Sequence, residues 1–269
     1  MDKRPIGVFD SGLGGLTCVK EIMKIMPSEN VIYFGDTGRV PYGSKGADTI
    51  VKYAKQDIRF LRSFDIKMII IACGTASSAV LPWIADEIDT EITGVVEPAV
   101  MAALRASKNG KIGVLGTAGT IRSGKYPEYI NRISRDIEVF PKACPMFVPL
   151  VENGYADSEA TRIIAAEYLA DIKAAGVDTL ILGCTHYPLL KPVISEIMGE
   201  GVTLIDSGAA AADYAFTLLR DKDMLAPQGE CGEYRYFVSD TTEDFARLGG
   251  VFLNREICDG VKQIDIEKY

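Results

Sequence analysis

Residues 68–75 read MIIIACGT, an uncharged run rich in isoleucine that ends in a cysteine, a glycine and a threonine. Residues 180–187, LILGCTHY, repeat this arrangement, with the second cysteine 111 residues after the first (184 − 73). Short, continuously apolar runs are typical of strands buried inside a parallel sheet. Each cysteine turn leads into a predicted helix, starting near Ser77 and near Tyr187. The repetition predicts one such strand, turn and helix in each of two domains.

Outward from these two runs, short segments rich in valine and isoleucine alternate with longer amphipathic stretches. This pattern predicts an α/β fold with doubly wound, mainly parallel sheets. The predicted strands are residues 6–9, 31–34, 68–72, 92–96, 112–115, 137–140, 180–182, 203–205 and 234–238. The predicted helices are residues 16–26, 48–63, 77–88, 158–175, 189–198 and 209–219. Because ligands bind outside the carboxyl ends of such strands, we expect the two cysteine turns to face one cleft.

The composition excludes several classes of function. Of 269 residues, 48% are hydrophobic and 25% are charged, which is ordinary for a globular protein. The net charge of −8 leaves no basic footprint, which argues against nucleic acid and against an anionic membrane as partners. We find no run of about 20 apolar residues and no signal-peptide core, so a cytoplasmic protein is expected. Six scattered cysteines without a CxxC pair and a single histidine predict neither a disulfide framework nor a zinc site.

The cysteines divide into two groups by their position. Most free cysteines behave as small buried hydrophobic residues, and this is the expectation for Cys18, Cys144, Cys231 and Cys258. Cys73 and Cys184 differ because each follows a strand at the start of a helix, where backbone N–H groups favour a thiolate. A thiol whose pKa is lowered from about 8.5 can take or give a proton near neutral pH. The sequence therefore predicts proton chemistry at Cys73 and Cys184.

Three further loops follow predicted strands. Residues 7–15, GVFDSGLGG, lack the last glycine of a dinucleotide fingerprint, because position 17 is threonine; Asp10 and Ser11 are still placed to meet a polar ligand. Residues 119–126, GTIRSGKY, have Walker A spacing but end in tyrosine instead of serine or threonine, which argues against ATP. Residues 35–43, GDTGRVPYG, are interpreted either as a polar cluster at a strand end or as a simple turn.

A lone histidine is more often structural than catalytic. His186 is only two residues from Cys184, where an imidazolium favours the thiolate and a neutral imidazole relays its proton. Glu152 has two interpretations that the residues leave open: a solvated carboxylate, or a partner of this histidine.

The chain resembles the glutamate racemases of the cofactor-independent aspartate/glutamate racemase superfamily. The resemblance rests on blocks that run in family order and end with VSD (238–240) and FL (252–253). The main blocks are GVFDSGLGGLT (7–17), YFGDTGRVPYG (33–43), IACGTASS (71–78), GVLGTAGTI (113–121), CPMFVPLVENG (144–154), LGCTHYPLL (182–190) and LIDSGAA (204–210).

The resemblance implies two pseudo-symmetric α/β domains, residues 1–97 with 208–269 and residues 98–207, with the active site between them. It implies inversion of glutamate at Cα without pyridoxal phosphate or metal, so no cofactor is expected, and D-glutamate for peptidoglycan as the product. Cys73 would deprotonate D-glutamate and Cys184 would deprotonate L-glutamate. A homodimer is compatible with the sequence.

The other residues carried over by the resemblance are helpers of the two thiols and substrate contacts. Asp10 is expected to assist Cys73, and His186, with Glu152 behind it, to assist Cys184. The implied substrate contacts are Asp10, Ser11, Tyr42, Gly43, Thr75, Thr185 and His186. Inversion requires one ionised and one protonated thiol, so the active form is expected to be a half-ionised pair.

One position departs from the family pattern. The usual ACNT block has asparagine where this chain has Gly74. A missing amide contact to a charged group costs roughly 1.5–3 kcal/mol, so weaker glutamate binding is expected, and Gly74→Asn is expected to restore it. Two alternatives stay open: a related racemase of aspartate or a hydantoin, and a catalytically inactive protein that binds an acidic metabolite.

Overall fold

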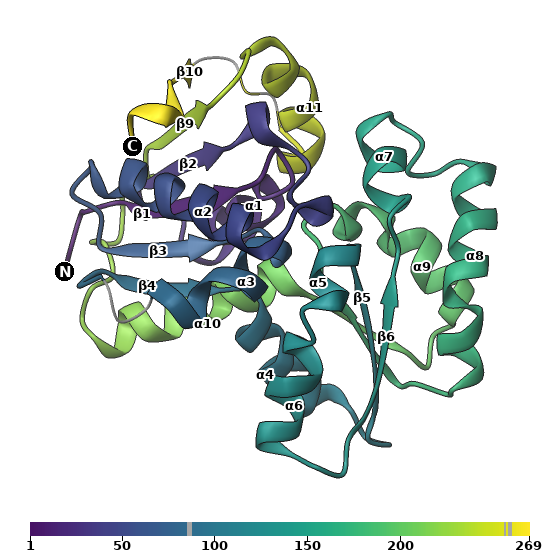
Figure 1. Ribbon diagram of the computed structural model, residues 1–269. Helices are drawn as coiled ribbons and strands as arrows, with labels where there is room; N and C mark the ends of the chain where they lie inside the picture. The colour runs from purple at the N-terminus through teal and green to yellow at the C-terminus, as the bar shows by residue number, and fades with distance from the viewer. Residues whose placement is uncertain (85–87, 256, 258–259) are drawn as a thin grey trace.

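The computed structural model describes residues 1–84, 88–255, 257 and 260–269. Residues 85–87 of the predicted helix 77–88, and Cys258, lie outside the described residues. Two separate sheets organise the chain, and both chain ends lie in the half that holds the first sheet (Figure 1).

The first sheet has six strands in the order β10-β9-β2-β1-β3-β4, and every pairing is parallel. Its central strands β1, β2 and β3 are buried along their whole length, as their continuous apolar sequences predict. The strands are β1 (Ile6–Asp10), β2 (Val31–Gly35), β3 (Met68–Ile71), β4 (Glu91–Gly94), β9 (Tyr234–Val238) and β10 (Val261–Gln263).

The second sheet has four strands in the order β6-β5-β7-β8, again all parallel. The strands are β5 (Lys111–Gly116), β6 (Glu138–Ala143), β7 (Thr179–Leu182) and β8 (Thr203–Asp206). This order matches β2-β1-β3-β4 of the first sheet, so β3 and β7 occupy equivalent places. Cys73 and Cys184 therefore follow equivalent strands, which confirms the expected α/β fold and its internal symmetry.

Helices cover both faces of each sheet (Figure 1). The α-helices are α1 (Leu16–Ile25), α2 (Ala47–Arg62), α3 (Gly74–Ile84), α4 (Val96–Ala106), α5 (Ala118–Arg122), α6 (Lys125–Ile133), α7 (Phe147–Glu152), α8 (Glu159–Ala174), α9 (Lys191–Met198), α10 (Ser207–Asp221) and α11 (Glu243–Leu253). Four short 3-10 helices are η1 (Thr37–Arg39), η2 (Tyr42–Ser44), η3 (Tyr187–Leu190) and η4 (Ile266–Lys268). The division of the chain at residues 97 and 207 into two domains stays a prediction.

The structure differs from the predicted elements in identifiable places. The strand predicted over 92–96 ends at Gly94, and α4 begins at Val96, because the apolar residues that follow pack as one face of a helix on the second sheet. Helices α4, α5, α6, α7 and α11 and strand β10 were not predicted. β10 is three residues long and largely exposed at the sheet edge, so it has almost no apolar pattern.

Cysteine burial follows the prediction with one correction. Cys18 and Cys144 are buried, whereas Cys231 is exposed. The prediction for Cys231 was wrong because it lies in the connection before β9, where no regular element covers it.

Within the described part of the chain, no helix is both long and apolar enough to cross a membrane.

Candidate active site

A cavity of about 300 Å³ lies between the carboxyl ends of the two sheets. Both cysteines singled out from the sequence line it, although their strands belong to different sheets. The lining residues are Ser11, Gly12, Val40, Pro41, Tyr42, Gly43, Ser44, Cys73, Gly74, Thr75, Thr117, Ala118, Pro145, Val148, Pro149, Glu152, Gly183, Cys184, Thr185 and His186. None of these is lysine or arginine, so the donors that line the cavity are hydroxyl groups, backbone N–H groups and the His186 ring.

Cys73 lies at the first turn of α3 and is 5% exposed. Its Sγ accepts a hydrogen bond from the backbone N–H of Ala76 at 3.4 Å and lies 3.6 Å from Ser11 Oγ. Burial, reinforced by the charge of Asp10, nevertheless raises the pKa of Cys73 to about 12. The raised pKa of Cys73 differs from the lowered pKa that its position at a helix start predicts. Desolvation of the thiolate exceeds the stabilisation from the helix N-terminus.

Cys184 has a histidine beside it instead of a serine. His186 Nδ1 lies 4.0 Å from Cys184 Sγ and 3.3 Å from Thr185 Oγ1. The other ring nitrogen, Nε2, lies 2.9 Å from Glu152 Oε1. Burial lowers the pKa of His186, but hydrogen bonds to Cys184 and Glu152 outweigh it and raise the pKa to about 10. The imidazole is therefore protonated at neutral pH, with one N–H directed toward the sulfur.

Glu152 fits both interpretations left open by the sequence. Its side chain is 42% exposed at the rim of the cavity, yet it pairs with a histidine that is 7% exposed. It comes from the end of α7, 34 residues away from His186 in the chain. The fold brings it there by packing α7 against η3, the short helix that follows the histidine.

Asp10 lies beneath the cavity rather than in its lining. It ends β1 and is 1% exposed; its Oδ2 accepts from the backbone N–H of Gly12 at 3.0 Å. Its Oδ1 accepts from Thr185 Oγ1 at 3.5 Å, a contact between the two sheets. Burial raises the pKa of the Asp10 carboxyl, against the opposing charge of His186. The side chain within hydrogen-bond distance of the Cys73 sulfur is that of Ser11, so the expected assistance of Asp10 to Cys73 stays a prediction.

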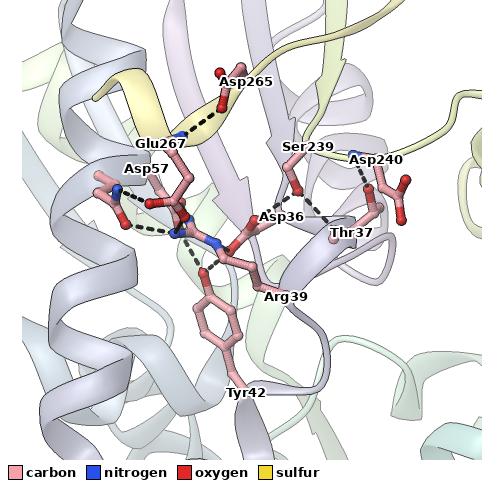
Figure 2. Close-up of polar contacts among 11 residues, drawn as sticks. Asp36, Thr37, Arg39, Tyr42, Asp57, Ser239, Asp240, Asp265 and Glu267 are labelled. Carbon is pink, nitrogen blue, oxygen red and sulfur yellow. Dashed lines mark hydrogen bonds and ion pairs between the residues drawn. The ribbon is translucent and has the colours of Figure 1, made fainter.

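The predicted substrate contacts gather around the same cavity. Ser11, Tyr42, Gly43, Thr75 and Thr185 all line it. The Tyr42 hydroxyl, however, contacts Asp36 and Asp57, so it lies away from the other lining residues (Figure 2). The surfaces that Tyr42 offers a ligand are thus its ring and backbone.

The structure gives a reason for glycine at position 74 that the sequence did not reveal. A Cβ added at this position would lie 2.3 Å from the backbone oxygen of Gly183, which belongs to the second sheet's cysteine turn. The two turns approach each other here, and any side chain requires them to separate. Gly74→Asn therefore requires the two turns to move apart, and the expectation that it restores an amide contact to substrate stays a prediction.

Thr117 was missed as a lining residue. It follows β5 at the place equivalent to Ser11 after β1, since Phe9 pairs with Ile71 and Leu115 pairs with Leu182 at matching positions. Its Oγ1 lies within hydrogen-bond distance of Thr75 Oγ1, at 2.9 Å. Its place after a predicted strand was the available signal.

The sequences that resemble nucleotide-binding motifs have other roles. Residues 119–126 run through α5 into the start of α6, so they form helix and not a phosphate-binding loop. Gly14 lets the chain pass close to the second sheet: a Cβ added there would lie 2.2 Å from Thr185 Oγ1 and 2.6 Å from the His186 ring. Among the described residues, we find no cluster of three or more histidine, cysteine or acidic side chains suited to a metal ion.

Comparisons with known proteins agree with this geometry. A profile of the Asp/Glu/Hydantoin racemase family matches residues 16–215. A glutamate racemase from Geobacter metallireducens is 46% identical over 267 residues, which cover 99% of this chain and 98% of that protein. The chain belongs to the glutamate racemase branch of this family.

Solved structures of the branch share the whole fold. A glutamate racemase from Bacillus anthracis superposes with a TM-score of 0.94 at 34% identity, covering 98% of each chain. One from Francisella tularensis, solved in complex with D-glutamate, superposes with a TM-score of 0.92 at 36% identity, covering all of both chains. The racemase fold therefore extends over the full length of this chain, including the C-terminal strands of the first sheet.

Proposed function

We propose that this protein interconverts L- and D-glutamate by proton transfer between Cα and two thiols on opposite sides of the substrate. One observation carries the proposal. Cys73 and Cys184 follow equivalent strands of two sheets, and both line one cavity. A planar carbanion-like transition state between two such thiols can lose a proton to one sulfur and gain a proton from the other.

The protons balance as follows. The Cys184 thiolate takes the Cα proton of L-glutamate while the Cys73 thiol gives its proton to the opposite face, which leaves D-glutamate, a Cys184 thiol and a Cys73 thiolate. The reverse reaction restores the starting state. Protonated His186 stabilises negative charge on Cys184. Hydroxyls and backbone N–H groups around the cavity stabilise the charge that develops on the α-carboxylate.

The test is optical. Purified protein with L-glutamate and no added cofactor is followed by circular dichroism, and D-glutamate and L-aspartate are assayed in the same way. Decay of the signal from both glutamate enantiomers, with a much slower change for aspartate, supports the proposal. Turnover of aspartate alone would favour a related racemase, and no turnover by folded protein would favour a binding protein.

Further parts of the proposal rest on the resemblance. D-Glutamate as a product suits a role in peptidoglycan synthesis, which takes place from cytoplasmic precursors, and we place the protein in the cytoplasm. A homodimer stays a prediction. Gel filtration with light scattering, in the presence and absence of glutamate, measures the oligomeric state directly.

A further inference from the structure

A buried charged cluster lies behind the wall of the cavity formed by residues 40–44 (Figure 2). It consists of Asp36, Arg39, Tyr42 and Asp57, and none of them takes part in the proposed proton transfers. The side chains of Asp36 and Asp57 are 0% exposed, and that of Arg39 is 11% exposed. Buried charges are costly unless paired, so this arrangement requires a physical explanation.

Arg39 joins the cluster to two distant parts of the chain. Its Nε donates to Asp36 Oδ2 at 2.7 Å, and its Nη2 donates to Asp57 Oδ1 at 3.1 Å. Its Nη1 donates to Gln56 Oε1 at 2.6 Å and to Glu267 Oε1 at 3.3 Å. Asp57 and Gln56 come from α2 and Glu267 from η4, so one guanidinium connects the loop after β2 with a helix and with the C-terminal segment.

The single hydroxyl proton of Tyr42 limits how the two carboxyl groups of the cluster can be hydrogen-bonded. The Tyr42 hydroxyl, which has one proton, lies within hydrogen-bond distance of both Asp36 Oδ2 and Asp57 Oδ2, the latter at 3.0 Å. If both carboxyls were ionised, only one could accept that proton. Asp36 accepts from two further donors, Arg39 Nε and Ser239 Oγ at 2.8 Å, whereas Asp57 accepts from one, Arg39 Nη2, so the surroundings of Asp36 favour the negative charge more. Asp57 then carries a proton and donates it to the tyrosine oxygen.

The environment of Asp57 agrees with this count. Burial, followed by the negative charge of Asp36, raises the pKa of the Asp57 carboxyl well above its usual range, although Arg39 opposes the shift. The resulting chain of donors runs from Asp57 through Tyr42 to Asp36. In this arrangement, each polar atom of the three side chains has a hydrogen-bond partner, and no two negative charges are in contact.

The turn next to the cluster lies where the two halves of the molecule meet. Gly43, next to Tyr42, packs against the second sheet: a Cβ added there would lie 2.9 Å from Thr117 Cβ. A Cβ added at Gly119 of α5 would lie 2.9 Å from the Gly43 backbone oxygen. The turn η2 is therefore held between the buried cluster on one side and α5 on the other.

We propose that Asp36, Arg39 and Asp57 are positioning residues that set the affinity for substrate by holding the Tyr42–Gly43 turn against α5, with Asp57 acting as a neutral donor and Asp36 as the charged acceptor. The proposal rests on the proposed function, because substrate affinity is measured with glutamate. It predicts that two neighbouring buried aspartates respond differently to the same substitution.

The experiment compares three aspartate-to-asparagine variants by their kcat and KM for both enantiomers. Asp36→Asn removes the charge that accepts from Arg39 and Tyr42, so KM is expected to rise about tenfold or more while kcat changes less than about threefold. Asp57→Asn keeps a neutral donor, so KM is expected to stay within about twofold of the wild type. Near-UV circular dichroism and Tm accompany each variant.

The matched control is Asp178→Asn. Asp178 also accepts several hydrogen bonds, from Ser107, Lys108, Asn109 and Thr179, but it lies before β7, at the end of the second sheet opposite the cavity. This variant is expected to lower Tm and leave kcat and KM unchanged. It separates the positioning effect from general loss of stability.

Wild-type protein is assayed first, so that inversion of glutamate is established independently. An unchanged KM in folded Asp36→Asn would then contradict the positioning role alone. An equal rise of KM in Asp57→Asn would contradict the proton assignment, and a loss in kcat without a change in KM would show that the cluster acts on the chemistry. If Asp36→Asn does not fold, Arg39→Lys serves in its place. Lysine keeps the positive charge but lacks the planar guanidinium that donates to several acceptors at once. A KM of Arg39→Lys within twofold of the wild type would overturn the proposal.

Discussion

The two thiol sites have the same backbone frame and different chemical partners. Cys73 and Cys184 follow equivalent strands, but Ser11 and the buried Asp10 carboxyl lie near the first, while His186 lies beside the second. Negative charge is disfavoured beside a carboxylate and favoured beside an imidazolium. The two sulfurs therefore have electrostatically different surroundings, although their strands are equivalent.

This difference shows how a symmetric fold supports a reaction between mirror images. A racemase must treat the two faces of Cα as chemical opposites at each moment, one as base and one as acid. Two equivalent strands place the thiols, and the residues around them make the thiols unequal. Each of the following predictions removes or measures one of the differences between the Cys73 and Cys184 sites.

The largest effect is expected from removing either sulfur. Cys73→Ala and Cys184→Ala should each lower kcat for inversion by at least about 10³-fold, because one face of Cα loses its proton carrier. In deuterium oxide, Cys73→Ala should still exchange the Cα proton of L-glutamate without inversion, and Cys184→Ala that of D-glutamate, as followed by proton NMR. Inversion at the wild-type rate in either variant would contradict the two-thiol mechanism.

A smaller loss is expected when the imidazolium is removed. His186→Asn should lower kcat/KM by about 10²-fold, which is typical for the loss of a general acid or base. The loss must be equal in both directions, because the enantiomers have equal free energies. Glu152→Gln, which keeps the shape but not the charge, should lower kcat/KM less than His186→Asn. If Glu152→Gln were the more damaging variant, Glu152 would have a role independent of the histidine.

The next effect concerns the residue after each cysteine, Gly74 in one turn and Thr185 in the other. Gly74→Ala places a Cβ 2.3 Å from the Gly183 oxygen, so it should lower the free energy of unfolding by about 1–3 kcal/mol. Gly201→Ala is the control, because its Cβ meets no atom within 4 Å. Urea unfolding measures both variants. Equal stability of the two would show that the turns separate without cost.

The last prediction is a pH dependence of stability. The pKa of His186 is raised to about 10 in the folded protein, so its contribution is fully present below about pH 6.5 and is lost as pH rises toward 10. The slope for one group is at most about 1.4 kcal/mol per pH unit. Urea unfolding of wild type and His186→Asn at pH 6, 8 and 9.5 should show a difference that shrinks with pH. A constant difference would contradict the raised pKa.

Most of the strands could be predicted from the local pattern of apolar residues. β9 was predicted with its observed bounds, and most other strands within one or two residues, because parallel strands buried on both faces have continuous apolar sequences. Both thiols were found because they end such strands. Helix α4 was missed because its apolar residues continue directly from a predicted strand, and periodicity over so few residues does not separate the two.

Pairs that are distant in sequence were harder to predict. The contact between Glu152 and His186 depends on the packing of two short helices, so the residues alone left it open. The exposure of Cys231 and the raised pKa of Cys73 both depend on what covers each sulfur, which only the tertiary structure decides. The close approach at Gly74 has the same origin, since the backbone oxygen nearest to an added Cβ belongs to the cysteine turn of the other sheet.

By itself, the sequence determined that this is an α/β protein with two cysteine turns at strand ends, and its ordered blocks placed it among the racemases. These are local properties, since an apolar run and the residues that end it are adjacent in the chain. The tertiary structure decided which charges meet: the imidazolium beside Cys184, the carboxylate beneath Cys73, and the aspartates that share one tyrosine. Burial and charge act through space, and their effect on a proton is decided only when the chain has folded.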